Sequence, residues 1–206
     1  MTMHYDRTQD ISLDESKPPL NVFPQTEYRN MLGGTCGVID GAFVFCGEFL
    51  VDAANNQIPT ATCKAMRPGD SDFSLFPSLP EPSRRGPFYL TEVQGIFWYI
   101  GGVTNTGGTY HYKTFKYDPG VGSWSYGHAM PMKMDNVCTE LLVEGGTEIF
   151  VSPSLTDSYQ PFIFDTVTGN WTRLEYNPFN GYKRYSRCSR YTNTDGRDFI
   201  VLAGGR

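Results

Sequence analysis

Arginine, lysine and tyrosine residues gather in short segments between the apolar stretches of this 206-residue chain. The guanidinium fork of arginine suits carboxylate groups, and arginine and tyrosine are frequent at the energetic centres of protein interfaces. Cations stand out in a chain whose net charge is −5. We therefore expect this set to bind a protein or an acidic peptide. The alternative is that its members are solvated loop residues or stack between structural units. The candidates are Tyr28, Arg29, Arg84, Arg85, Lys133, Tyr182, Arg184 and Arg187.

Five cysteines offer a second kind of chemistry. Cys46 ends one apolar run and Cys63 begins the next, and neighbouring antiparallel strands can bring two such residues to disulfide distance. A bridge there would contribute about 3 kcal/mol and would indicate an oxidising compartment, whereas the alternative is a pair of buried thiols. Cys36, Cys138 and Cys188 each fall in the first predicted strand of a different repeat unit, and at such repeated positions we expect buried thiols.

The chain lacks the residue sets that known catalytic sites require. His4, His111 and His128 are dispersed, and there is no C-x-x-C pair, G-x-S-x-G turn or phosphate-binding glycine loop. We expect no enzymatic activity, no metal and no cofactor. The sequon at 170–172 is a possible glycan acceptor, although its tryptophan also belongs to a structural repeat described next.

An apolar strand, a glycine doublet and a spaced pair of aromatic residues recur along the sequence. Gly101-Gly102 is followed by Tyr117 and, seven residues further on, by Trp124. Phe164 precedes Trp171 by the same seven residues, and Met66 precedes Phe73 likewise. The doublet positions are Cys46-Gly47, Gly101-Gly102, Ser152-Pro153 and Gly204-Gly205, at intervals of 55, 51 and 52 residues. A repeat of about 50 residues is typical of propeller blades.

Short apolar runs supply the strands that such units need. The runs at 41–45, 95–100, 148–151 and 198–202 each follow a glycine-containing turn signal. A strand-like segment precedes each turn, as at 139–143, and no segment of ten or more residues has a convincing helical period. The sequence therefore predicts an all-β protein built from hairpins.

The chain resembles the kelch-repeat β-propeller family over nearly its whole length. The motifs that carry the resemblance are Gly101, Gly102, Tyr117, Trp124, Phe164, Trp171, Gly204 and Gly205. It departs from the family pattern at Ile11, Met66 and Phe73 in the aromatic slots and at two of the doublets. The resemblance implies four-stranded antiparallel blades, with the doublet at the end of the second strand and the aromatic pair between neighbouring blades.

The resemblance divides the chain into about four units within a single domain, 1–206. Three units are complete and half-blades lie at both ends, with approximate bounds 1–34, 35–85, 86–135, 136–185 and 186–206. One interpretation is that the chain is part of a longer ring of five to seven blades. The other is that the N-terminal strands complete the blade begun by the C-terminal ones and close a ring of four.

In kelch propellers the partner-binding face is formed by the loops after the doublet and the loops between blades, which is where the candidate cations lie. The resemblance thus implies a noncatalytic binding scaffold. The alternatives are an extracellular glycan-binding or adhesive module, or a degenerate part of an oxidase or sialidase propeller related to galactose oxidase or the sialidases.

Composition limits the partner and the compartment. The acidic charge argues against nucleic acid, and no apolar run reaches the roughly 18 residues of a membrane helix. The first thirty residues hold no apolar stretch typical of a secretory signal peptide. The Cys46–Cys63 pair and the sequon nevertheless favour the cell exterior, with the cytoplasm as the alternative.

Overall fold

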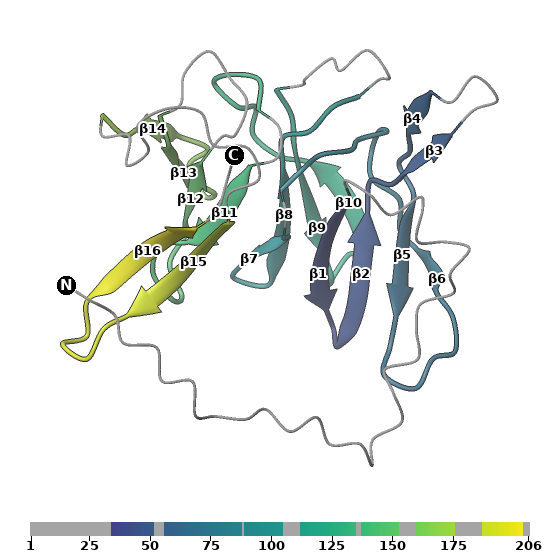
Figure 1. Cartoon of the computed structure of the whole chain (residues 1–206), viewed down its shortest axis with the longest axis horizontal. Coiled ribbons are helices and arrows are strands. Elements are labelled where there is room, and N and C mark those ends of the chain that lie inside the picture. Colours follow the sequence, from purple (N-terminus) through teal and green to yellow (C-terminus); the bar gives the residue numbers. More distant parts are fainter. Residues whose placement is uncertain are drawn as a thin grey trace.

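The structure, a computed structural model, describes residues 34–51, 56–87, 89–104, 112–134, 137–152, 160–175 and 187–203. Within these ranges every regular element is a β-strand, and no helix is present that could span a membrane (Figure 1). Three of the sheets have four antiparallel strands each, and we call them the first, second and third blades.

Each blade uses its strands in the order of the sequence. The first blade contains β1 (Thr35–Ile39), β2 (Ala42–Cys46), β5 (Cys63–Met66) and β6 (Ser74–Phe76). The second contains β7 (Thr91–Val93), β8 (Ile96–Ile100), β9 (Thr114–Asp118) and β10 (Ser123–Tyr126). The third contains β11 (Cys138–Leu141), β12 (Glu148–Ser152), β13 (Phe162–Asp165) and β14 (Trp171–Arg173).

Two smaller sheets complete the described structure. β15 (Arg187–Thr192) and β16 (Asp198–Ala203) form a two-stranded hairpin, and β15 lies against β11. β3 (Phe49–Val51) and β4 (Gln57–Pro59) form a short ribbon in the loop between β2 and β5. The sequence predicts the hairpin but not the ribbon, since that loop reads as polar at its Asn55-Asn56 centre.

Tight turns join the first and second strands of the first two blades. Asp40 and Gly41 both have positive φ angles, 49° and 74°, and so do Gln94 and Gly95, at 51° and 82°. Two consecutive left-handed residues define the two-residue turn whose twist matches that of antiparallel strands. The predicted turn positions are therefore confirmed.

The aromatic pairs lie across the third and fourth strands of the blades. Trp124 is the direct cross-strand partner of Tyr117, with ring centroids 5.3 Å apart. Trp171 pairs with Phe164 in the same way, and those rings stack at 4.4 Å. The seven-residue spacing thus places both aromatic side chains on one face of the sheet, because opposite residues of an antiparallel pair point the same way.

The same aromatic residues hold each blade against the preceding one. Tyr117 of the second blade contacts Phe76 of the first, at 4.8 Å between centroids. Phe164 of the third blade meets Trp98 of the second edge to face, at 5.2 Å. The expectation that these rings bury surface between blades is confirmed.

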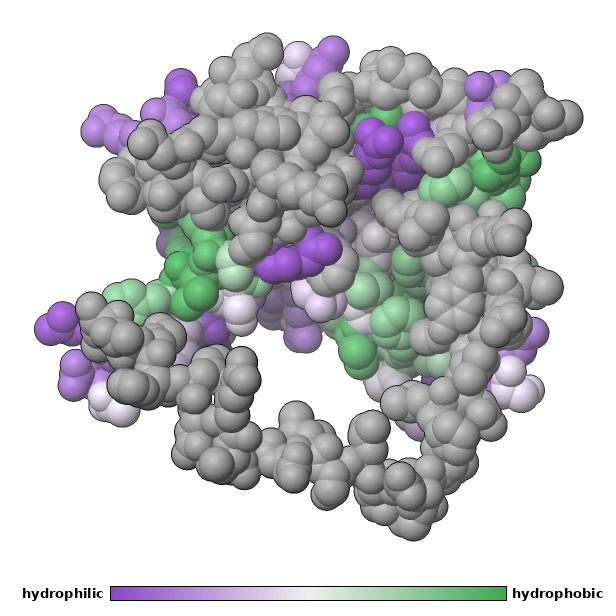
Figure 2. Space-filling model, viewed as in Figure 1, coloured by the Kyte–Doolittle hydropathy of each residue, from purple (hydrophilic) through white to green (hydrophobic). Residues whose placement is uncertain are grey.

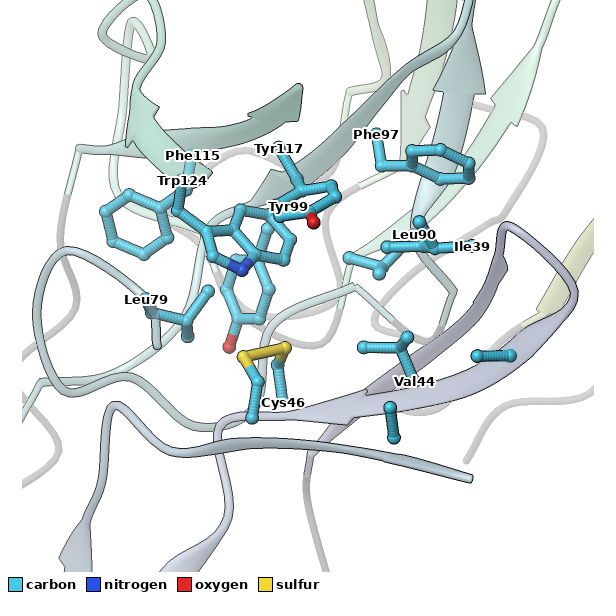
Figure 3. Packing of buried hydrophobic residues seen from close by; sticks show 13 residues of the cluster. Ile39, Val44, Cys46, Leu79, Leu90, Phe97, Tyr99, Phe115, Tyr117 and Trp124 are labelled. Carbon is cyan, nitrogen blue, oxygen red and sulfur yellow. A yellow bond between two sulfur atoms is a disulfide. The ribbon is translucent and has the colours of Figure 1, made fainter. Parts of the chain in front are cut away.

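The buried hydrophobic residues form two clusters, each of which lies between two neighbouring blades. One lies between the first and second blades and includes Val44, Tyr99 and Trp124; Figure 3 shows these side chains with the Cys46–Cys63 disulfide beside Tyr99. The other lies between the second and third blades and includes Trp98 and Phe164. No single core runs through the molecule's described part; instead each interface between neighbouring blades is a core of its own.

The first strands of successive blades approach one another. Cys36 of β1 forms a parallel bridge with Tyr89, and β11 contacts both β7 and β15. Thr91 Oγ1 donates to Thr139 Oγ1 at 2.7 Å, which links the first strands of the second and third blades. The first strands of successive blades thus lie side by side, and the remaining strands of each sheet extend outward from them. This is an all-β, propeller-like arrangement.

Candidate functional site

Because the first strands run parallel, all of them begin at the same end of the blades, where the second strands finish and the doublets lie. We call this end the doublet face; Figure 1 shows the β3–β4 ribbon at this end and the tight β1–β2 turn at the other. Gly101 marks it in the second blade. Its φ is 80°, its N–H donates to Lys113 O, and a Cβ there would lie 2.6 Å from Met134 O of the following inter-blade loop.

Gly47, not Cys46, takes the corresponding first position in the first blade. Its φ is 76°, its N–H donates to Thr62 O just before the third strand, and a Cβ would lie 2.6 Å from Ser83 O. The doublet therefore corresponds to Gly47-Glu48, one residue later than the sequence predicts. Spacing alone placed Cys46 first, because the register of the strands is not visible in the sequence.

Arg84 is held inside the structure. Its backbone N–H and carbonyl pair with those of Val103, just after the Gly101 doublet, and the residue is 4% exposed. Burial, followed by the neighbouring charge of Arg85, lowers the pKa of the Arg84 guanidinium. Arg84 thus links an inter-blade loop to the segment just after the Gly101 doublet through backbone hydrogen bonds. The charged Arg84-Arg85 pair in the sequence does not indicate this structural role.

Arg85 and Lys133 lie in two successive inter-blade loops of the doublet face. Arg85 is half-buried and has a positive φ of 55°. Lys133 is exposed, and its Nζ lies 5.6 Å from the centroid of the Tyr112 ring. The ammonium group and the ring form a cation–π pair that is accessible to solvent. Tyr112 therefore joins the candidate binding residues, although the sequence alone did not single it out.

Arg187 begins β15 and is exposed. Burial lowers the pKa of its guanidinium, and the nearby Tyr89 and Cys36 oppose that shift. Burial likewise raises the pKa of the Cys36 thiol, while the positive charge of Arg187 counteracts this. Residues from β1, the start of the second blade and β15 therefore share one electrostatic environment on the doublet face, although they are distant in the sequence.

Disulfides fix part of this region. The predicted Cys46–Cys63 bridge is present, between directly opposite residues of β2 and β5 with Cα atoms 4.1 Å apart. The expectation of buried thiols at Cys138 and Cys188 is wrong, because these residues form a second bridge with Cα atoms 5.7 Å apart. It joins the first strand of the third blade to β15, next to Arg187. Cys36 keeps its thiol.

The other candidate residues lie outside the described part of the chain. They are Tyr28, Arg29, Tyr182 and Arg184, together with the predicted doublet residues Gly204 and Gly205. Arg85, Lys133 and Arg187 remain as exposed or half-buried cations at the doublet face.

Two apolar residues are also exposed on the doublet face. Leu50 and Ile58 are opposite each other in the β3–β4 ribbon and are 50% and 43% exposed. A group of hydrophobic residues shows at the corresponding place, at the upper right, in Figure 2. The Phe49-Leu50-Val51 run could have indicated this strand in the sequence.

A shallow hollow of about 420 Å³ lies at the opposite end, between the first and second blades. The tight turns line it, and its charged groups are Asp40, Glu92 and Asp118. Within the described ranges no group of three or more His, Cys, Asp or Glu side chains has a geometry suited to a metal ion.

Comparison with known proteins supports the fold only. No protein-family model and no curated protein matches the chain. Among solved structures, the chain is similar to the one titled "Structure of YjhT", with a TM-score of 0.62 and 14% sequence identity. The similarity covers 76% of this chain and 55% of that one, so the matched part spans about half of YjhT.

Proposed function

We propose that the protein is a noncatalytic binding scaffold of the kelch type, whose doublet face takes a protein or an acidic peptide. The repeat of about 50 residues and the aromatic pair at each blade interface support the kelch assignment. In this proposal the described strands are three complete blades and the first half of another.

The observation that carries the proposed partner is the setting of Arg187. Arg187 is an exposed residue near Tyr89 and Cys36, and it begins the strand that the Cys138–Cys188 bridge anchors. An arginine held in place loses less conformational entropy on binding a carboxylate than a freely rotating one. Lys133, stacked over Tyr112, adds a second cation at the same end.

Binding of a fluorescein-labelled oligoglutamate peptide tests the proposal. Arg187→Ala should weaken binding about tenfold, equivalent to about 1.4 kcal/mol. Arg67→Ala is the matched control, because it removes the same charge from an exposed position in the β5–β6 turn, at the opposite end. Binding should also fall as salt is added. Equal losses in the two variants, or no binding to the parent protein, would refute the proposed site.

The disulfides support a proposal for the compartment. Two bridges are typical of proteins that mature in an oxidising environment. We place the protein outside the cytosol on that ground. Asn170 of the sequon is exposed, so a glycan could be attached without disturbing the adjacent aromatic pair.

A further inference from the structure

The hollow opposite the doublet face is a second candidate surface, and it does not depend on the function proposed above. It lies between the first and second blades, and residues of the β1–β2, β7–β8 and β9–β10 turns line it. Its volume is about 420 Å³. Ligand pockets in proteins commonly have volumes of about 300–1,000 Å³. The hollow is therefore large enough for a single side chain or a small ligand.

The charged groups of the hollow all have the same sign. Asp40, Glu92 and Asp118 line it, and no lysine, arginine or histidine is among its lining residues. None of the three carboxylates forms an ion pair with a described residue. Carboxylates that come from two blades and have no counter-charge between them favour a cation in the space that they share.

The turn that carries Asp118 leaves one of its carboxylate oxygens available. In the equivalent turn of the third blade, the Thr168 hydroxyl donates to Asp165 Oδ2. Val121 occupies the position of Thr168 in the second blade, so this donor is lacking there. Asp118 Oδ1 accepts a hydrogen bond from Gly120 N at 2.8 Å, and Oδ2 accepts none from a described residue.

A buried tyrosine adjoins these carboxylates. Tyr117 is 6% exposed and lies directly opposite Phe97, so its side chain shares a face of the sheet with this wall residue of the hollow. Its hydroxyl makes no hydrogen bond to a described residue. Burial raises the pKa of the Tyr117 hydroxyl, and the negative charges of Asp40 and Asp118 raise it further. The hydroxyl therefore lies near carboxylates of both blades and can accept a hydrogen bond from a donor placed between them.

Apolar side chains form another part of the wall. Val38 of the first blade is 64% exposed, and Ile96 of the second blade is partly buried. Arginine and lysine have an apolar stem that packs on such surfaces, while the charged head group stays in a polar environment. An apolar wall beside unpaired carboxylates thus suits a long cationic side chain better than a simple ion.

We propose that this hollow binds an arginine or lysine side chain from a basic segment of a partner protein. The head group lies between the Asp40 and Asp118 carboxylates, and the stem lies against Val38 and Ile96. A guanidinium has enough donors to bind both carboxylates at once. Because the two carboxylates belong to different blades, the site exists only where the blades pack together.

A fluorescein-labelled peptide with arginine at alternate positions tests the proposal by fluorescence anisotropy. Asp40→Asn/Asp118→Asn should weaken its binding about tenfold, because both charged contacts are lost. Asparagine keeps the oxygen that accepts from Gly120 N and tolerates the φ of 49° at position 40, so both substitutions suit the fold.

Asp70→Asn/Asp72→Asn is the matched control. It removes the same charge from exposed positions in the β5–β6 turn, at the same end of the molecule but outside the hollow. It should weaken binding by less than about twofold.

Amide NMR signals of the turn glycines locate the peptide without any substitution. The peptide should shift the signals of Gly41, Gly95 and Gly120, which line the hollow, and should leave that of Gly69 in the β5–β6 turn unchanged. The same peptide with citrulline in place of arginine should cause no shift, because citrulline has a similar shape but no charge.

Several results would overturn the proposal. They are the absence of binding to the parent protein, equal weakening in the two double variants, equal binding of the citrulline peptide, and shifts that include Gly69. Shifts of Gly41, Gly95 and Gly120 on concentrating the protein alone would assign the hollow to a second copy, and would also overturn it.

Discussion

Gly101 combines two constraints that a side chain cannot meet. Its φ of 80° is costly for any residue with a Cβ, and that Cβ would lie 2.6 Å from Met134 O. Gly122 has a similar φ of 72°, but nothing lies within 4 Å of its Cβ position. Substitutions at Gly101 and Gly122 therefore distinguish the cost of backbone strain from the cost of disturbing the contact with the Met134 loop.

We expect Gly122→Ala to lower the free energy of unfolding by about 1 kcal/mol, through strain alone. Gly101→Ala should lower it by about 3 kcal/mol or more, because the loop at Met134 must also move. Urea denaturation of both variants measures the difference. Similar losses at the two positions would show that the doublet does not support the neighbouring loop.

Asp165 predicts how stability responds to acid. Hydrogen bonds from Thr168 Oγ1 at 2.7 Å and from Val167 N at 3.0 Å lower the pKa of its carboxyl. The stabilisation is therefore complete above the ordinary carboxyl pKa of about 3.8 and is lost as pH falls through the lower pKa of the folded protein. Asp165→Asn keeps an acceptor oxygen but does not titrate at this position.

Thermal melts of the parent and of Asp165→Asn between pH 7 and pH 2 test this. The difference in stability between them should be constant near neutral pH and should shrink at acidic pH. A difference that does not change with pH would mean that the Asp165 carboxylate makes no ionisation-dependent contribution.

The cysteines show what could be predicted for individual residues. Cys46 and Cys63 lie in consecutive strands of one blade, so their pairing follows from the antiparallel strand pattern within one repeat unit. Cys138 and Cys188 lie 50 residues apart in different blades. Their pairing depends on the packing of β11 against β15, and the strand pattern within each unit contains no information about that contact. The burial of Arg84 could not be predicted from the sequence for a similar reason, since it accompanies a backbone bridge to Val103 in another loop.

At the level of elements, the third and fourth strands of the second and third blades each act as a platform for one aromatic pair. The sequence predicted these pairs well because cross-strand partners in a short hairpin keep a fixed spacing. The β3–β4 ribbon was missed because its strands have only three residues each. The doublet register was displaced by one residue in the first blade, where only one glycine is present.

Trp124 in β10 offers an element-scale prediction. Its side chain is buried against Tyr117, whereas Tyr126, two residues later in the same strand, is 53% exposed. Trp124→Ala should lower the free energy of unfolding by about 3–5 kcal/mol, and Tyr126→Ala by about 1 kcal/mol or less. Chemical denaturation measures both. Equal losses would contradict the assignment of Trp124 to the blade interface.

For the whole molecule, the disulfides set the number of thiols. Denatured, unreduced protein should react with one equivalent of a thiol reagent, at Cys36, because the other four cysteines are bridged. In the folded protein at mildly alkaline pH this reaction should be slower than that of a free cysteine, since burial raises the pKa of the Cys36 thiol. Reaction of three thiols would mean that only one disulfide is present, and reaction of all five would mean that there is none; either result would contradict the prediction.

The arrangement of the blades depends on contacts between aromatic rings of successive sheets, such as that between Trp98 and Phe164. A double-mutant cycle with Trp98→Leu and Phe164→Leu measures that contact directly. We expect a coupling energy of about 1 kcal/mol, against none for the control pair Trp98→Leu and Phe76→Leu, whose members belong to different clusters. Additive effects at Trp98 and Phe164 would contradict the packing of the third blade on the second, and with it the propeller-like structure.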